Sequence, residues 1–293
     1  MTWDRAMALV LATSATLYTV GLVRLWRRAG RARGIRPLNV AAFAAALGAL
    51  VIALLSPLDR LSDALFSAHM GQHEILMLVA APLVVMGKPW LTTPWALPAR
   101  HRARVLALAQ APALRRPFRA VTGPATILVL HALALWIWHV PRLFEGAMHS
   151  EGVHAVQHFC FFATAALFWW ALVYGRYGRT GYGAGVLFVF ITALHSGLLG
   201  AMITFAGRLW YPLYDARSRA AGHDPLADQT LAGLLMWIPA GVILTVLGLA
   251  LLAAWLGEAE RRARSIPPGA GAPREALPVP SHRPRSTASP RRT

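Results

Sequence analysis

The sequence predicts an all-α membrane protein: a polytopic transmembrane helical bundle of seven helices, with its N-terminus outside and its C-terminus in the cytoplasm. The first observation is composition, because the 293 residues are 56% hydrophobic and only 14% charged, with a mean hydropathy of +0.48. The second is that apolar runs near 20 residues long recur along the chain, and about 20 helical residues cross a membrane. Open-edged β-structure is excluded because lipid cannot satisfy its backbone.

Seven apolar runs are long enough to be transmembrane helices. They centre on residues 7–25, 38–55, 66–87, 121–140, 152–174, 185–206 and 230–256. Residues 1–256 are therefore expected to form one transmembrane domain. The first run follows a segment without net positive charge, which indicates a retained anchor rather than a signal peptide. The tail, residues 257–293, is basic and rich in proline, with little to bury, and is expected to be disordered.

The positions of the arginines predict the orientation. The first connection holds a dense cluster of basic residues, namely Arg24, Arg27, Arg28, Arg31, Arg33 and Arg36. The third is equally basic and its stretch 100–119 predicts an interfacial amphipathic helix, whereas the second and fourth each hold one arginine beside acidic residues. By the positive-inside rule the odd connections and the tail are cytoplasmic. The net charge of +17 then reflects orientation and contact with anionic membrane lipid, and no nucleic acid partner is expected.

Two short stretches share the pattern H-x-x-Q-H. One runs from His69 to His73 and the other from His154 to His158, at the expected outer ends of the third and fifth helices. Residues four apart lie about 40° apart around a helix, so each pair presents two imidazoles to one ion. Ionisable rings inside a bilayer are costly and usually functional. The matched pairs predict a metal or haem site between the two helices.

Other residues of the same leaflet are candidates to extend this site. His139 ends the fourth helix, His195 lies in the sixth, and two methionines, Met202 and Met236, are candidate soft ligands. His195 and Met202 are about 10 Å apart along their helix axis, so they are expected to mark successive stations rather than to share an ion. Side chains expected to orient the imidazoles are Gln72, Glu74 and Gln157. By contrast, His131 and His149 are expected to make ordinary interhelical hydrogen bonds, and His223 lies in a loop.

The ligand types favour copper as the metal. Imidazole suits several transition metals, and added thioether shifts the preference towards Cu(I). A haem with one axial histidine from each of two helices is the main alternative. Di-iron sites draw on several carboxylates, which are scarce here. A retinal protein is excluded because the only lysine, Lys88, does not lie in the last helix.

Four separated segments carry a resemblance to a known family. They are residues 67–73 with their apolar continuation to Pro89, residues 136–141, residues 154–158 and residues 228–241. In this order they resemble the CtaG-type cytochrome c oxidase assembly factors of bacteria, over the second to the seventh helix. The resemblance implies a multi-pass plasma-membrane protein that is needed for active haem-copper oxidase and acts in its copper supply.

The resemblance also points to particular residues. The family's motif positions fall on His69, His73, His139, His154, His158, His195 and Met236. Gln157 is a departure, because many relatives are expected to carry an acidic residue there. The expected function is therefore a non-enzymatic assembly factor that binds copper near the outer face and delivers it to a cytochrome c oxidase subunit.

Partners and alternatives follow from this expectation. An external copper chaperone is a further candidate partner. The alternative function is a membrane redox enzyme or haem-binding protein with haem or a di-metal centre between the third and fifth helices. A metal permease is a third hypothesis, but it would need polar ligands through the cytoplasmic half of the bundle, where these helices lose them.

Overall fold

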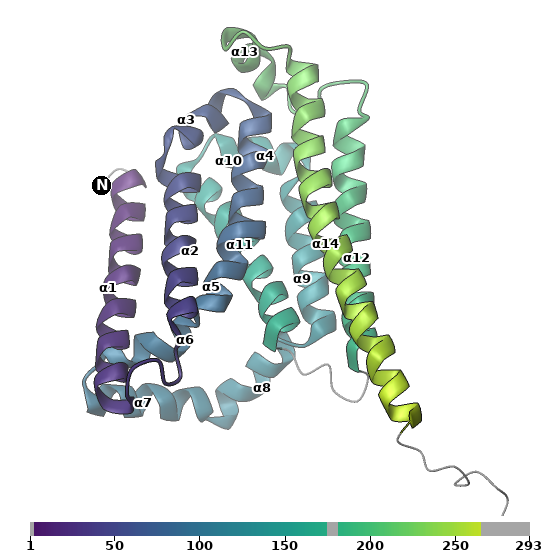
Figure 1. The fold of residues 1–293 in the computed structure, drawn as a ribbon. Coiled ribbons are helices and arrows are strands. Elements are labelled where there is room, and N and C mark those ends of the chain that lie inside the picture. Colours follow the sequence, from purple (N-terminus) through teal and green to yellow (C-terminus); the bar gives the residue numbers. More distant parts are fainter. Residues whose placement is uncertain (1–2, 175–180, 265–293) are drawn as a thin grey trace, which may run out of the picture.

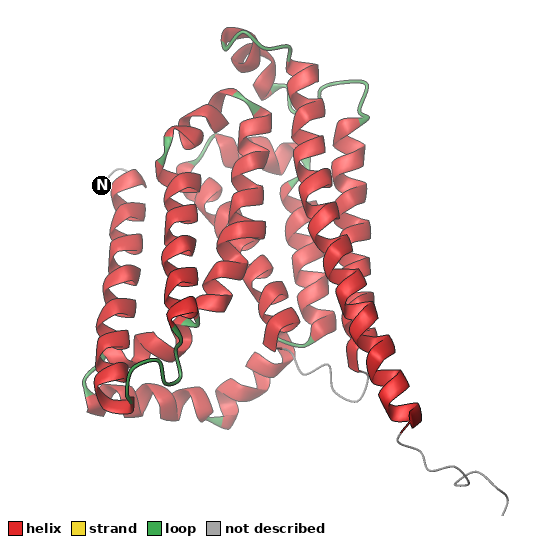
Figure 2. Cartoon of the chain, in the orientation of Figure 1, coloured by secondary structure: helices red, strands yellow, loops and turns green. Residues whose placement is uncertain are grey.

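The computed structural model describes residues 3–174 and 181–264, and these residues form helices joined by short loops, without any strand (Figures 1 and 2). The long helices are α1 (Trp3–Ala29), α2 (Pro37–Leu55), α9 (Pro124–Trp138), α11 (Glu151–Tyr174), α12 (Gly181–Thr204) and α14 (Pro225–Arg264). The third expected helix is divided into α4 (Phe66–Glu74), the π-helix η1 (Ile75–Ala80) and α5 (Ala81–Gly87). The shorter connecting helices are α3 (Pro57–Ala64), α6 (Pro89–Thr92), η2 (Thr93–Ala96), α7 (Ala99–Gln110), α8 (Pro112–Val121), α10 (Pro141–Met148) and α13 (Leu213–Ala220).

The all-α membrane bundle is confirmed. Within the described ranges, six helical segments are long and apolar enough to cross a membrane, and the bent pair α8–α9 brings the number to seven if it is one span. The expected fourth helix is the shortest, because α9 has only 15 residues, or about 22 Å, and α8 turns away from it by 62° at Gly123–Pro124. The residue before a proline disfavours helical geometry, which explains the break there.

The two ends of the bundle differ in what they carry. The start of α1 lies at the same end as α3, α10 and α13, while α6, α7, α8 and the end of α14 lie at the other (Figure 1). The arginine-rich connections therefore gather at one end. The basic stretch 100–119 forms two helices, α7 and α8, which run across that end and are separated at Pro112. That this end faces the cytoplasm stays a prediction from the arginine rule.

The third transmembrane element contains a π-helix just before Pro82, which cannot donate a backbone hydrogen bond. The N–H of Ala81 bonds to the carbonyl of Leu76 five residues earlier, so the next bond in this register would run from Pro82 to Met77. The indole nitrogen of Trp169 on α11 takes its place and donates to the Met77 carbonyl at 2.9 Å. The irregular segment is thus fastened to α11, directly below the histidines of α4.

The last helix is longer than its apolar run. It continues to Arg264, eight residues beyond the expected end of the transmembrane domain at 256. Two ion pairs at i,i+4 spacing, Glu258 with Arg262 and Glu260 with Arg264, favour this continuation. The remainder of the tail expected to be disordered lies outside the described residues.

The arrangement of the two ends gives a direct test of orientation. Reporter fusions after Arg33, Asp59, Arg104 and Glu145 should report cytoplasmic, external, cytoplasmic and external positions in turn, because the arginines should stay inside. Paired alkaline phosphatase and green fluorescent protein reporters provide the measurement. A cytoplasmic signal from the fusion at Glu145 would contradict the orientation.

Candidate metal centre

Five histidines from three helices gather inside one end of the bundle. They are His69 and His73 on α4, His154 and His158 on α11, and His139 at the C-terminal cap of α9. The helical spacing brings together the rings within each pair, with centroids 4.4 Å apart on α4 and 4.1 Å apart on α11. Between the helices, the centroids of His69 and His154 are 5.1 Å apart, as are those of His73 and His158.

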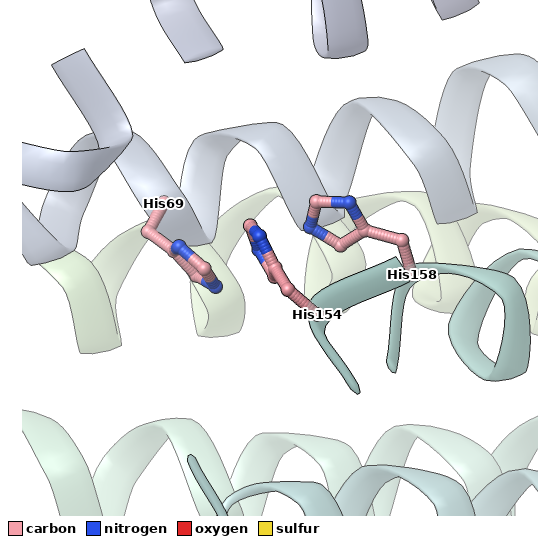
Figure 3. Close-up of side chains that lie close together, drawn as sticks. All are labelled: His69, His154 and His158. Carbon is pink, nitrogen blue, oxygen red and sulfur yellow. The ribbon is translucent and has the colours of Figure 1, made fainter. Parts of the chain in front are cut away.

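These separations fit a shared metal ion. A metal–imidazole bond is about 2 Å long, so two imidazoles on one ion have ring centroids no more than roughly 6.5 Å apart. The close ring pairs in the group range from 4.1 Å, between His154 and His158, to 6.3 Å, between His73 and His139. His139 is close to His73 alone among the other four histidines. The three rings of His69, His154 and His158 lie in a row between α4 and α11 (Figure 3). Their nitrogens lie within 4.8 Å of one another, and no other set of three His, Cys, Asp or Glu residues does so in the described part of the chain.

Most ring nitrogens of this five-histidine site are buried without hydrogen-bond partners. His69, His73, His139 and His158 are between 0 and 6% exposed, and His154 is partly buried. Seven of their ring nitrogens are inaccessible and unpaired among the described residues. A buried polar group without a partner costs about 1–3 kcal/mol, so the arrangement is costly unless something binds there. Buried, unpaired nitrogens on neighbouring imidazoles are suited to a cation.

His139 shows how one of these ligands is prepared. Its Nδ1 lies 2.7 Å from the carbonyl oxygen of Leu135, and because a carbonyl can only accept, Nδ1 carries the hydrogen. The other ring nitrogen, Nε2, then has a free lone pair, and it is buried and unpaired. Metal-binding histidines commonly hold their second nitrogen in this way.

Aromatic side chains cover the five-histidine site on the side of α10 and α13. Phe66, Phe144, Tyr211 and Tyr214 are almost fully buried, and the ring centroid of Phe144 lies 5.1 Å from that of His69. The Tyr211 hydroxyl donates to the His139 carbonyl at 2.9 Å. Burial raises the pKa of both tyrosines, so their hydroxyls remain protonated and able to donate. These rings close the five-histidine site on this side.

Asp228 on α14 holds the start of α4 and hence the first histidine pair. Its carboxylate accepts from the backbone N–H of Phe66 at 2.7 Å and of Ser67 at 3.2 Å, and also from the hydroxyls of Ser67 and Ser218. A carboxylate at a helix N-terminus satisfies free N–H groups and favours the helix dipole. Asp228 lies in one of the four segments that carry the family resemblance, but its role at α4 was not predicted from the sequence. A carboxylate at the head of an apolar helix was the signal that could have identified its role.

Two residues expected to orient imidazoles have other surroundings. Gln72 donates its side-chain amide to Asp59 at 2.7 Å and to the Ala53 carbonyl, because it lies about 60° from His69 on the side away from His73. It therefore joins α4 to α2 and α3. Glu74 lies on the wall of a different cavity and makes no hydrogen bond to His73 among the described residues.

The third such residue, Gln157, is fully buried, and neither of its amide atoms has a hydrogen-bond partner in the described structure. Its expected role in orienting a histidine is therefore not seen.

Asp59 on α3 accepts the hydrogen bond from the Gln72 amide. Burial raises the pKa of the Asp59 carboxyl group, and the hydrogen bond from Gln72 opposes this effect.

The remaining candidate ligands do not join the five histidines. Met202 is 40% exposed and shares the outward side of α12 with Leu198 and Phe205, because α12 packs against α14 through its other side. Met236 is buried and lines the cavity that contains Glu74. The ring of His195 lies near that cavity, with its centroid 6.2 Å from that of His131.

Comparison with known protein families identifies the family of this chain. A family model described as cytochrome c oxidase caa3 assembly factor matches residues 16–258. The chain belongs to this family. The match includes all five histidines of the site and confirms the resemblance seen in the sequence. No curated protein and no solved structure gave a match.

Membership of the caa3 assembly-factor family fixes the broad role of the chain. It is a membrane-helical member of a family that assembles cytochrome c oxidase, and such a role is non-catalytic, in agreement with the expectation from the sequence. The oxidase is accordingly the partner that the family indicates.

The position of Asp228 generates a prediction. Asp228→Asn should lower the stability of the purified protein by about 1–2 kcal/mol, because an amide can accept only some of the bonds that hold α4. Thermal unfolding in detergent provides the measurement. The control is Asp215→Asn, which removes an exposed carboxylate paired with Arg219 and should have little effect. Equal unfolding temperatures for both variants would show that Asp228 does not hold α4.

Proposed function

We propose that this protein binds Cu(I) at the five-histidine site and supplies it to a cytochrome c oxidase subunit in the bacterial plasma membrane. The observation that supports this most strongly is the set of seven buried, unpaired ring nitrogens on neighbouring histidine rings in the described part of a caa3 assembly factor. The residues fit a metal ion because His69, His154 and His158 already have their nitrogens within 4.8 Å of one another.

The charge and chemistry of the five-histidine site favour a monovalent ion. Its ligands are neutral imidazoles, which suit copper, and it lies inside a bundle of apolar helices. A divalent ion there would carry two uncompensated charges in a poorly polar surrounding, whereas Cu(I) carries one. A di-iron centre would require several carboxylates around the ion. Haem is disfavoured because the rings of Phe144 and Phe161 pack directly on the histidines, at 5.1 Å from His69 and 4.6 Å from His73.

The number of ligands suits transfer rather than permanent storage. Five imidazoles exceed what Cu(I) needs, so one ligand can replace another as the ion moves. Centroid distances of 4.1, 5.1 and 6.3 Å connect His154 to His158, His158 to His73 and His73 to His139. His154 is the least buried member, and exposed Asp63 on α3 is close enough to interact with it electrostatically. We therefore place the entry of copper at His154.

Copper binding by single variants tests whether the five histidines act as one site. His73→Ala and His158→Ala should each remove most of the copper bound at this site, and the double variant should lose little more, because residues that act as a unit are not additive. Metal analysis of purified protein provides the measurement. His149→Ala is the control, because this exposed histidine bonds to the Glu145 carbonyl outside the site and should retain wild-type copper. Losses that add between the two single variants would contradict a shared ion.

Delivery of copper is tested in a strain that lacks the protein. Under copper-limited growth the oxidase polypeptides and haem should still be made, but the enzyme should be deficient in copper and in turnover. Added copper should restore part of the activity, since mass action can replace a carrier when the receiving site is intact. The paired change His69→Ala and His73→Ala should reproduce the deletion, whereas His101→Ala, at the other end of the bundle, should not. Normal copper content in the deletion strain would contradict the proposal, and a deficit confined to haem would favour the haem alternative.

A further inference from the structure

A second polar centre lies inside the bundle, separate from the five-histidine site. It is a cavity of about 40 Å³ where α4 and η1 meet α9, α11, α12 and α14. The polar and sulfur-containing side chains on its wall are Glu74, Met77, His131, Thr192, Ser196 and Met236. The other lining residues are apolar. A water molecule needs about 10–15 Å³ by this measure, so the cavity can hold an ion beside its ligands.

His131 presents a free ring nitrogen in this region. The single hydroxyl hydrogen of Thr164 is donated to the Cys160 carbonyl at 2.8 Å. Thr164 Oγ1 must therefore accept from Nδ1 of His131, which lies 3.2 Å away. Nδ1 then carries the ring hydrogen, and Nε2 has a lone pair. The interhelical hydrogen bond expected for His131 is present, and it prepares the ring as a ligand in the same way as the Leu135 carbonyl prepares His139.

His195 is the second imidazole; it lies beside the cavity, next to the lining residue Ser196, and does not itself line the wall. Both of its ring nitrogens are inaccessible and have no hydrogen-bond partner in the described ranges. Its ring centroid lies 6.2 Å from that of His131, within the roughly 6.5 Å limit for two imidazoles on one ion. The two rings come from α12 and α9, which are neighbours in the bundle. They are therefore spaced to hold an ion between them.

Two further donors complete the set. Met236 is 5% exposed and lines the cavity, and its thioether is a soft ligand. Glu74 contributes a carboxylate whose Oε2 is buried and unpaired among the described residues. His73 and Glu74 are consecutive residues on α4, about 100° apart around the helix. The same turn of helix therefore carries a residue of each centre.

We propose that this cavity is a second Cu(I) site, held by His131, His195 and the Met236 thioether, with the Glu74 carboxylate facing the ion. Two imidazoles with a thioether form a donor set that favours Cu(I) over hard cations such as Mg²⁺. Only the identity of the ion rests on the proposed function; the cavity and its donors do not. The donors here are less closely gathered than His69, His154 and His158, whose nitrogens lie within 4.8 Å of one another, so we expect weaker binding than at the five-histidine site.

A titration of the purified full-length protein in detergent tests the second site. Under anaerobic, reducing conditions, Cu(I) in competition with bicinchoninate should fill two equivalents, one tighter than the other. The paired change His131→Gln and His195→Gln should remove the weaker equivalent and keep the tighter. The paired change His69→Ala and His73→Ala should do the reverse. A single equivalent in the wild-type protein, unaffected by the His131 and His195 changes, would overturn the second site and leave the first intact.

Sulfur ligation gives an independent readout. With two equivalents bound, X-ray absorption at the copper edge should detect a sulfur neighbour at about 2.3 Å in the wild-type protein. Met236→Leu preserves side-chain volume and should abolish this signal. Met202→Leu is the matched control, because Met202 is exposed on the outward side of α12, and the signal should persist. Absence of the sulfur signal from the wild-type protein, or its persistence in Met236→Leu, would contradict the proposed ligand set.

Discussion

Inside a lipid bilayer a polar group finds its partner within the protein or has none, and the structure is organised around this constraint. Several groups that hold the fold together meet this constraint. Trp169 bonds to the carbonyl that Pro82 leaves free, Asp228 satisfies the N–H groups at the start of α4, and the Gln72 amide joins Asp59. The five-histidine site is the largest exception, because seven of its ring nitrogens are buried without partners among the described residues. Glu74, Gln157 and His195 also hold buried, unpaired atoms in the described part of the chain. Since one nitrogen each of His69, His154 and His158 lies within 4.8 Å of the others, the largest exception has the form of a ligand site.

The histidines are held from several directions. Asp228 on α14 fixes the head of α4, and the π-helix below the pair is fastened to α11 by Trp169. Single π-helical turns within α-helices are frequent at functional sites, and here the turn follows directly after His73 and Glu74. The aromatic side chains on α10 and α13 exclude water from one side. A site supported in this way is preorganised, so an ion that enters meets ligands already in position.

The sequence predicted those features that depend on local periodicity. The lengths of the apolar runs predicted the transmembrane helices of the bundle. The i,i+4 spacing predicted that the two histidines of each pair lie on one side of their helix, and in the structure their rings are close together. Features that depend on how helices pack were not predictable. The bend at Gly123 shortened α9, Gln72 turned to α2 and α3, and Met202 was left on the outward side of α12. The rotation of a helix about its axis is set by its neighbours, which a single sequence does not reveal.

The central claim is that the five buried histidines hold a metal ion, and anomalous diffraction from crystals of copper-loaded protein tests it most directly. Data collected on both sides of the copper edge should give a peak between α4 and α11, about 2 Å from ring nitrogens of at least two among His69, His154 and His158. A clean map without such a peak, in which ordered waters occupy hydrogen-bonding positions on the ring nitrogens, would contradict the claim.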